Sequence, residues 1–514
     1  MKKYLIITLL FLFVLPGYSQ DSDNENIKDV TILHWNDFHA RNTAYKINKK
    51  DSTGQQVQVF VGGTSSMLGY INKYRDNKTL LLNGGDDFQG TPISSITRGY
   101  SQIELLNLYK LDAFVLGNHD FDYGMYSLDS ALKGANYEFL AANLAYKGKT
   151  KTFAKPYLIK NINGIKIGII GVSPMDLMTL TLPKNVSDIQ MLNTDSAIAA
   201  DITILKKEKC NLIILLSHNG EDRDKDFAEK FHKDIDIIIG GHSHTPIFRP
   251  EIVDGVLICQ AGSYGRWLGK LDIKVDIKKD TVVKYFGKLY ETIFDSAVYD
   301  KPAEEKVEKM IASIEPEMKR PIGTLLSDWK KNNLGQWETD AIREKLQTDI
   351  AFLNSGSIRK TMIKGDITVG DVWEINPFGN SMMKFSVTGK TLKKMIANSI
   401  RMSSKGKDNP EYDNILLSGI YVEFYSKNIT PESDDFITKI TVGGSDLNEN
   451  NNYSVSTNNY TVSQLKKYFG EIPEEIKAED TNILDRDLII EAVQKQKEIN
   501  SVFEKRIIDK STEQ

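Results

Sequence analysis

The side chains of this sequence that can do chemistry gather where apolar runs end. The clearest case is the segment Gly117–Asp122, which follows the apolar run Ala113–Leu116 and contains an asparagine, a histidine and two aspartates. The apolar run predicts a buried β-strand, and the glycine behind it predicts a turn. An imidazole, an amide and carboxylates crowded at a strand end indicate either a bound cation or a catalytic centre.

Four other apolar runs end in residues of the same kind. Five of the seven histidines of the chain lie at these strand ends, and chance placement would rarely give that distribution. The resulting candidates for metal binding or catalysis are Asp37, His39, Asp86, Asn118, His119, Asp122, His218, His242 and His244.

The spacing of these residues suits a metal centre. In the segments Asp37–His39 and His242–His244 the two outer residues point to the same side, because strand side chains alternate. The glycine pairs at 84–85 and 240–241 allow sharp turns and close backbone approach. The ligand atoms are all nitrogen and oxygen, which favours Zn, Mn or a similar divalent ion. A carboxylate such as Asp86 can bridge two ions, and ions ~3.5–4 Å apart hydrolyse phosphate esters.

The pattern from Asp29 to about Asp300 predicts the element types that position these residues. Short runs rich in β-branched residues alternate with amphipathic segments, as in Ile165–Val172 followed by Asp195–Glu208. Continuous apolar runs such as Leu212–Leu216 suit strands that are covered on both faces. We therefore expect an α/β domain with central sheets, outer helices and its chemistry at the carboxyl ends of strands.

A connecting helix and a second domain are expected to follow. Residues 301–320 are polar and charged with one apolar stripe, which predicts a single helix closed by Pro316 and Pro321. From Ile322 to about Lys510 the pattern mixes strands with helices, including Leu334–Leu346 and Asp485–Arg506.

The strand-end segments resemble those of the secreted 5'-nucleotidase family, within the calcineurin-like metallophosphoesterases. The matching segments are Ile32–His39, Gly85–Pro92, Gly117–Gly124, Leu216–His218 and Gly240–His244. The resemblance implies a four-layer α/β/β/α metallophosphoesterase sandwich domain at residues 27–298 and a connecting helix at residues 299–320. A smaller α+β substrate-binding domain would follow at residues 321–510.

By this resemblance, two divalent metal ions would be held by the strand-end residues. One ion would be bound by Asp37, His39, Asp86 and His244, and the other by Asp86, Asn118, His218 and His242. His119, oriented by Asp122, would stabilise charge in the transition state and would not bind metal. Asp120 matches a variable position of the family and is interpreted as a local turn residue.

The second domain resembles the family's nucleotide-binding domain through the segments Asn354–Arg359 and Pro377–Asn380. By resemblance, Arg359 would contact the substrate phosphate, Phe378 would stack on a base and Asn380 would hydrogen-bond near the ring. The alternative is a core aromatic at Phe378 and a surface ion-pair partner at Arg359. Tyr460 is either the second face of a base clamp or an ordinary amphipathic tyrosine.

Two features depart from the family pattern. Family members commonly follow the second stacking aromatic with a Gly-Gly-Asp-Gly loop, whereas Tyr460 is followed here by Thr461–Lys466. Lys330 and Lys331 stand where an arginine is expected, and a lysine supplies charge without the bidentate fork. The sequence therefore indicates phosphoester hydrolysis more strongly than a preference for nucleotides.

Composition and the N-terminal residues indicate which partners the protein can bind and where in or outside the cell it acts. A net charge of −4 leaves no basic footprint for a nucleic acid. Residues 1–20 place Lys2 and Lys3 before an apolar run, which predicts a secretory signal peptide. We expect an exported protein, periplasmic or secreted, without a transmembrane anchor and either monomeric or dimeric. Cys210 and Cys259 could form a disulfide, but two buried thiols are the better interpretation.

Together these features predict two-metal hydrolysis of phosphate esters. A 5'-nucleotidase that releases phosphate from nucleoside monophosphates is the first expectation. The alternatives on the same fold are a nucleotide-sugar or 2',3'-cyclic nucleotide phosphodiesterase and a related sulfur-ester hydrolase. A binding protein that retains the metals without turnover is suggested by the missing Gly-Gly-Asp segment, but the intact His119 and Asp122 argue against it.

Overall fold

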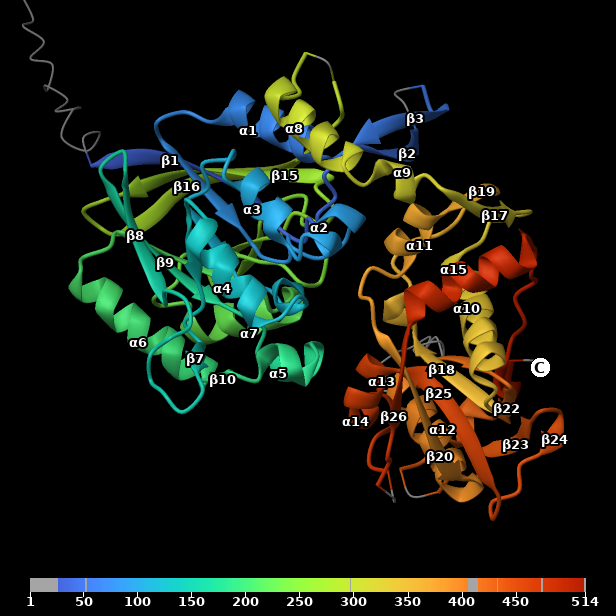
Figure 1. Ribbon diagram of the computed structural model, residues 1–514. Coiled ribbons are helices and arrows are strands. Elements are labelled where there is room, and N and C mark those ends of the chain that lie inside the picture. Colours follow the sequence, from blue (N-terminus) through green and yellow to red (C-terminus); the bar gives the residue numbers. More distant parts are fainter. Residues whose placement is uncertain are drawn as a thin grey trace, which may run out of the picture.

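The structure is a computed structural model of the 514-residue chain. It describes residues 26–50, 53–295, 297–404, 415–431, 433–472 and 475–512, so the expected signal peptide at residues 1–20 lies outside the described residues. Two α/β domains lie side by side, with the short helices α8 and α9 near the passage between them (Figure 1).

Two six-stranded sheets form the centre of the N-terminal domain. The first has the order β16-β15-β1-β4-β5-β6 and the second the order β13-β14-β12-β11-β9-β8. The strands of the first sheet are β1 (Ile27–Trp35), β4 (Thr79–Asn83), β5 (Ala113–Val115), β6 (Glu138–Leu140), β15 (Trp267–Asp276) and β16 (Thr281–Glu291). Those of the second are β8 (Tyr157–Ile162), β9 (Ile165–Val172), β11 (Leu212–Ser217), β12 (Ile237–Ile239), β13 (Glu251–Val253) and β14 (Val256–Cys259).

The two sheets pack face to face, and helices cover both outer faces. Ile32 and Leu82 of the first sheet share one buried cluster with Ile169 and Ile214 of the second. The outer face of the first sheet packs on α1 (Thr64–Tyr74), α3 (Tyr100–Leu106) and α4 (Met125–Gly134), and that of the second on α6 (Thr194–Lys207) and α7 (Glu221–Phe231). Because β9, β11 and β12 are covered on both faces, their sequences are almost continuously apolar. The four-layer α/β/β/α prediction is confirmed.

Several small elements complete this domain. They are β2 (Tyr45–Lys50), β3 (Gln56–Val61), α2 (Pro92–Ile96), β7 (Leu144–Tyr146), α5 (Leu177–Leu180) and β10 (Ile189–Met191). The cysteines Cys210 and Cys259 are both free and buried, as predicted.

The connector consists of two helices, so the prediction of one helix over residues 299–320 is wrong. The helix α8 spans Lys301–Ala312 and α9 spans Glu315–Met318. Pro316 has no N–H to donate to the carbonyl one turn before it, so it ends the first helix and suits the start of the second. Ala303 of α8 packs into the same cluster as α1, which fastens α8 to the N-terminal domain. The domain boundaries themselves stay predictions.

A five-stranded sheet of order β21-β18-β25-β20-β26 forms the centre of the C-terminal domain. Its strands are β18 (Ile350–Asn354), β20 (Ser381–Thr388), β21 (Ile415–Ser418), β25 (Asn452–Asn458) and β26 (Glu479–Leu484). The helices α10 (Lys331–Leu346), α11 (Val369–Ile375) and α15 (Asp485–Gln496) pack in one cluster, and α12 (Gly389–Ser404) packs in another. The remaining elements are β17 (Pro321–Leu325), β19 (Gly365–Thr368), β22 (Ile420–Phe424), β23 (Ile437–Val442), β24 (Ser445–Asp446), α13 (Asn459–Ser463), α14 (Leu465–Phe469), β27 (Glu498–Ile499) and β28 (Ile507–Asp509).

The last helix is shorter than the sequence pattern suggested. The helix α15 ends at Gln496, ten residues before the expected end at Arg506, because Lys497 adopts a left-handed φ of 65°. The chain then pairs with β17 as the strand β27. Across the described residues, no helix combines the length and the apolar character that crossing a bilayer requires.

Candidate metal centre and substrate cavity

All nine candidate residues follow the carboxyl ends of parallel strands. Asp37 and His39 come after β1, Asp86 after β4, and Asn118, His119 and Asp122 after β5 of the first sheet. His218 follows β11, and His242 and His244 follow β12 of the second sheet. The parallel strands of both sheets therefore deliver their polar ends to one edge of the sandwich.

Close backbone contact joins these loops across the sandwich. A Cβ atom added at Gly84 would lie 2.7 Å from the carbonyl oxygen of Gly240, so only glycine fits there. The backbone N–H groups of Asp37 and His39 donate to the carbonyls of Gly85 and Asp86 at 2.8 and 3.0 Å. The predicted role of the glycine pairs in close approach is confirmed.

Five candidate ligands adopt a left-handed backbone that is uncommon for residues other than glycine. The φ angles are 50° at Asp37, 51° at His39, 61° at Asp86, 76° at His242 and 57° at His244. Such conformations cost of order 1–3 kcal/mol each and concentrate at functional sites, where the surrounding structure holds them. Here the left-handed conformations direct these five side chains toward one another.

Asp37, His39 and His244 form a first ligand cluster. Their candidate ligand atoms all lie within 4.8 Å of one another. Oδ1 of Asp37 lies 3.2 Å from Nε2 of His244 and 3.9 Å from Nε2 of His39. Nδ1 of His39 lies 3.2 Å from the carbonyl oxygen of Gln89. Because a carbonyl only accepts, Nδ1 carries the proton and Nε2 offers its lone pair to the cluster.

Asp86, His218 and His242 form a second cluster of the same size. Nε2 of His218 lies 3.1 Å from Oδ2 of Asp86, and its Nδ1 donates to the carbonyl of Gly84 at 2.5 Å. The first cluster adjoins the second, since Oδ1 of Asp37 also lies 3.9 Å from Nε2 of His218. Six of the predicted ligands are thus brought together.

The chemistry of these clusters fits bound cations. Within the part of the chain that the structure describes, Oδ1 of Asp37 and Oδ1 of Asn118 are buried without a hydrogen-bond partner. An unpaired buried polar atom costs about 1–3 kcal/mol, and more if it is charged. Burial raises the pKa of Asp37, but His218 and His244 outweigh it and bring that pKa to about 2. One unpaired oxygen of an ionised carboxylate and one unpaired amide oxygen, surrounded by imidazole nitrogens, are what divalent ions bind.

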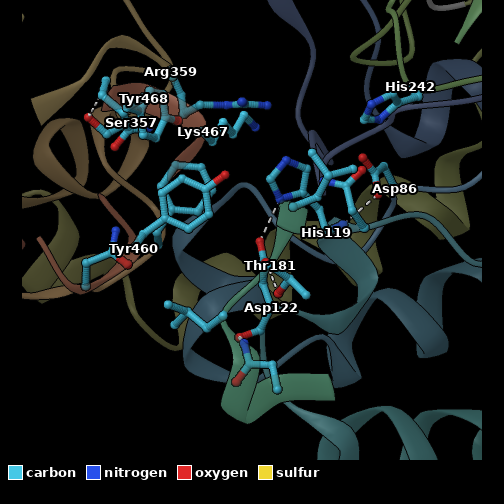
Figure 2. A pocket seen from close by; sticks show the side chains of 18 of the residues that line it. Asp86, His119, Asp122, Thr181, His242, Ser357, Arg359, Tyr460, Lys467 and Tyr468 are labelled. Carbon is cyan, nitrogen blue, oxygen red and sulfur yellow. Dashed lines mark hydrogen bonds and ion pairs between the residues drawn. The ribbon is translucent and has the colours of Figure 1, made fainter. Parts of the chain in front are cut away.

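His119 and Asp122 form a hydrogen-bonded pair beside the clusters. Nδ1 of His119 lies 2.7 Å from Oδ2 of Asp122, so Nε2 is free to face a substrate (Figure 2). Burial lowers the pKa of His119, but the carboxylates of Asp122 and Asp86 together outweigh it and leave that pKa raised. Thr181 donates to Oδ1 of Asp122 at 3.4 Å, and Asn185 donates to its carbonyl oxygen at 2.9 Å. Sequence reasoning missed Thr181 and Asn185, which carry no motif.

Asp120 is not the local turn residue that the sequence suggested. Its buried carboxylate accepts hydrogen bonds from four backbone N–H groups. The donors are Gly117 at 2.8 Å, Asp86 and Asp87 at 3.1 Å, and Phe88 at 3.2 Å. Asp120 therefore joins the turn after β5 to the turn after β4 and holds Asp86 in place. The donors are distant in sequence, so no local pattern identifies this role.

A cavity of about 420 Å³ lies between the domains and opens onto both clusters. The C-terminal domain contributes all four predicted substrate residues to its lining, namely Arg359, Phe378, Asn380 and Tyr460. Figure 2 shows Arg359 and Tyr460 facing His119 and Asp122 across this space. The volume is in the range of ligand pockets, roughly 300–1,000 Å³.

The ring of Phe378 lies close to both His119 and Arg359. Its ring centroid is 5.7 Å from that of His119, and the guanidinium carbon of Arg359 is 5.7 Å from its centre. Asn380 is buried on the wall, and its backbone carbonyl accepts a hydrogen bond from the Asp485 N–H at 2.9 Å. Burial and the charge of Arg359 together lower the pKa of Lys331.

Comparison with known proteins agrees with this geometry. Residues 30–246 match the model of the calcineurin-like phosphoesterases, and residues 313–471 match that of the 5'-nucleotidase C-terminal domain. The chain belongs to the 5'-nucleotidase family of calcineurin-like phosphoesterases. Both matches fall on the domains that contribute to the cavity.

Individual relatives are distant but extend over most of the chain. The trifunctional nucleotide phosphoesterase protein YfkN of Bacillus subtilis is 27% identical over 92% of this chain, which covers only 34% of that protein. The endonuclease YhcR of the same organism is likewise covered over 34% of its length, so the chain spans about a third of these two relatives. A 5'-nucleotidase-related protein of Glossina morsitans morsitans is 29% identical over 81% of this chain and 82% of its own.

The fold has a close match among solved structures. The 5'-nucleotidase precursor of Thermus thermophilus superimposes with a TM-score of 0.80 at 24% identity, over 93% of this chain and 99% of that one. Calcineurin-like 5'-nucleotidases use two divalent metal ions, and the two ligand clusters of this family member agree with that requirement.

Proposed function

We propose that the protein is a two-metal hydrolase that releases phosphate from nucleoside 5'-monophosphates. One observation carries the proposal: a single cavity joins two metal-type clusters and His119 on one side to Arg359, Phe378 and Tyr460 on the other. The first set suits a phosphate, and the second adds a cation and aromatic rings that suit a nucleotide. The names of the Glossina and Thermus proteins support the same substrate class.

The two clusters and the unpaired oxygens of Asp37 and Asn118 support the ligand sets that the family resemblance implies. One ion would be held by Asp37, His39, Asp86 and His244, and the other by Asp86, Asn118, His218 and His242. With nitrogen and oxygen donors only, Zn or Mn suits both positions. When bound, such ions lower the pKa of water and neutralise phosphoryl oxygens.

The chain's own residues orient the substrate and stabilise charge. The Asp122 carboxylate holds the proton of His119 on Nδ1 and favours the imidazolium, whose other N–H can donate to oxygen as negative charge develops. Arg359 contributes a second fixed positive charge, and Phe378 restricts its position. We assign His119 and Asp122 to catalysis and Arg359 to phosphate binding.

Recognition of the organic part is assigned to the aromatic wall. Phe378 would stack on a base, Tyr460 would cover its other face and Asn380 would border the ring. Export to the periplasm or the medium is proposed from the signal-like residues 1–20 alone.

Release of inorganic phosphate from a substrate panel tests the proposal. Purified protein with Zn²⁺ or Mn²⁺ is given AMP, other nucleoside monophosphates, ADP, a nucleotide sugar, a 2',3'-cyclic nucleotide and p-nitrophenyl phosphate. We expect the highest kcat/KM with a nucleoside monophosphate and a selective loss of nucleotide turnover in Phe378→Ala. If p-nitrophenyl phosphate is hydrolysed but none of the nucleotides is, the assignment of nucleotides as substrates is wrong. If no ester is hydrolysed, a metal-retaining binding protein is the better description.

A further inference from the structure

Residues 173–186 of the N-terminal domain, which lie between β9 and β10, are held in place at their start by two buried asparagines. Oδ1 of Asn143 accepts a hydrogen bond from the N–H of Ser173 at 3.0 Å, and its Nδ2 donates to the Ser173 carbonyl at 2.8 Å. Oδ1 of Asn219 accepts from the N–H of Met175 at 2.9 Å. The start of this segment is therefore fixed to the second sheet of the sandwich.

The rest of the segment is fastened to the first sheet and to the backbone of Asp122. Leu177 and Val186 are buried in the apolar cluster on the outer face of that sheet. Nδ2 of Asn185 donates to the backbone carbonyl of Asp122 at 2.9 Å. The residues between Leu177 and Asn185 therefore have a defined position relative to the His119–Asp122 pair.

Thr181, near the middle of the segment, directs its hydroxyl at Asp122. Its backbone is extended, with φ −129° and ψ 169°, between α5 and the 3₁₀ turn Pro183–Val186. The side chain is only 1% exposed, although its neighbours Leu180 and Leu182 are partly exposed at the cavity. Oγ1 donates to Oδ1 of Asp122 at 3.4 Å, and among the described residues it forms no other hydrogen bond (Figure 2).

The two oxygens of the Asp122 carboxylate thus have separate partners. Oδ2 lies 2.7 Å from Nδ1 of His119, and Oδ1 accepts from Thr181. The torsion about the Cβ–Cγ bond of an aspartate is soft, but a carboxylate bonded at both oxygens cannot rotate without losing a hydrogen bond. The side chains of His119 and Asp122 are each 17% exposed, so water, which fixes no direction, would replace a lost bond.

We propose that Thr181 is a positioning residue that, through Asp122, keeps His119 oriented toward the reacting phosphate. This inference rests on the proposed function of His119 and Asp122. Because the hydroxyl acts on the pair and not on the substrate, its removal should lower kcat and leave KM nearly unchanged. Thr179 is a matched control, since it is exposed and its hydroxyl donates to the carbonyl of Asp176 at 2.9 Å.

The first test measures phosphate release from AMP and p-nitrophenyl phosphate by the Zn²⁺-loaded enzyme. Thr181→Val should lower kcat about tenfold, with KM within about twofold and the metal content unchanged. Thr181→Ser should keep most of the rate, and Thr179→Val should behave as the wild type. Thr181→Ala and Thr181→Ser both lack the methyl group and differ in the hydroxyl, so this pair decides even if Thr181→Val does not fold. Equal kcat in the two would overturn the proposal.

A double-mutant cycle tests whether the hydroxyl acts through Asp122. In the Asp122→Ala background, which has no carboxylate to orient, Thr181→Val should lower kcat further by less than about twofold. A further loss of about tenfold in that background would show that Thr181 acts independently of Asp122, and the proposal would fail.

A spectroscopic measurement separates this inference from the proposed activity. The Nδ1–H of His119, bonded to a carboxylate, should give a downfield proton resonance that is absent in His119→Ala. Thr181→Val should shift this resonance and speed its exchange with water, whereas Thr179→Val should not. An unchanged resonance in Thr181→Val would overturn the inference even if AMP is a good substrate. Absence of turnover in the wild type would overturn the proposed function, while the resonance still decides whether Thr181 positions the pair.

Discussion

The carboxylate of Asp120 accepts a hydrogen bond from the backbone N–H of Asp86, with 3.1 Å between Oδ2 and the nitrogen. The two residues follow neighbouring parallel strands, β5 and β4. Asp86 is proposed to ligate both ions. By fixing the position of the Asp86 backbone, Asp120 should therefore affect metal binding without being a ligand itself. Residues that orient a ligand commonly affect metal affinity 10–100-fold when changed.

Asp120→Asn should weaken metal binding by about tenfold or more. Each carboxylate oxygen accepts two backbone N–H groups, and an asparagine would turn an N–H₂ donor toward two of those donors. Metal content after dialysis against graded chelator measures the effect. Asp129→Asn, which alters an exposed pair with Lys133, should retain metal as the wild type does. Equal retention in both variants would show that Asp120 does not position Asp86.

His119→Ala should lower kcat by about 10²–10⁴-fold and leave the metal content unchanged. The imidazole lines the cavity, its Nδ1 contacts Asp122, and it lies outside both ligand clusters, so we expect it to contact the substrate and not a metal ion. Phosphate release and elemental analysis of the same sample measure both quantities. His232→Ala, a histidine at the exposed end of α7, serves as the control. Loss of metal in His119→Ala would mean that this histidine is a ligand.

Linking the domains covalently should stop turnover if substrate exchange needs the domains to separate. Arg41 of the N-terminal domain forms an ion pair with Glu374 of the C-terminal domain, with 3.4 Å between Nη1 and Oε2. The double variant Arg41→Cys and Glu374→Cys can be joined by a cleavable bismaleimide. Burial raises the pKa of both native thiols, that of Cys259 to about 12, so they should react slowly.

Activity should fall on cross-linking and return when the linker is cleaved. The unlinked double variant should stay near wild-type stability, because a partly exposed ion pair contributes about 0–1 kcal/mol. Undiminished phosphate release from fully cross-linked protein would refute the requirement for domain separation.

Glu338→Met should stabilise the protein at pH 8 and much less near pH 5. Glu338 on α10 is fully buried, and neither carboxylate oxygen has a partner within the described residues. Burial and the nearby Asp485 raise the pKa of Glu338 well above its ordinary value of 4.5. The folded protein therefore holds this proton more tightly than the unfolded chain, and stability falls as the pH rises above 4.5 toward the folded-state pKa.

Methionine removes the ionisation at similar volume, so the gain at pH 8 should be about 1–3 kcal/mol. Thermal unfolding at both pH values measures it. Glu344→Met on the same helix changes an exposed pair with Lys495 and should shift Tm little at either pH. A gain of the same size at pH 5 and pH 8 would show that ionisation of Glu338 is not the cause.

The sequence by itself determined that the protein has a metal-binding type of site and which β-strands position its residues. Apolar runs such as Ile165–Val172 appear as strands with the predicted ends, because strands covered on both faces must be apolar throughout. The side chains that follow them, including Asp37 and His218, could be named as ligands because parallel strands deliver their ends to one edge. These inferences need only local pattern and strand direction.

The tertiary structure decided what depends on contacts between distant segments. It made Asp120 a support for Asp86, set five candidate ligands in left-handed backbone, and split the connector at Pro316. It also directed the hydroxyl of Thr181 at Asp122, while that of Thr179 bonds to a carbonyl of its own turn. A hydrogen bond, a strained φ or the choice between two nearby threonines depends on partners far away in sequence, and no local pattern records those partners.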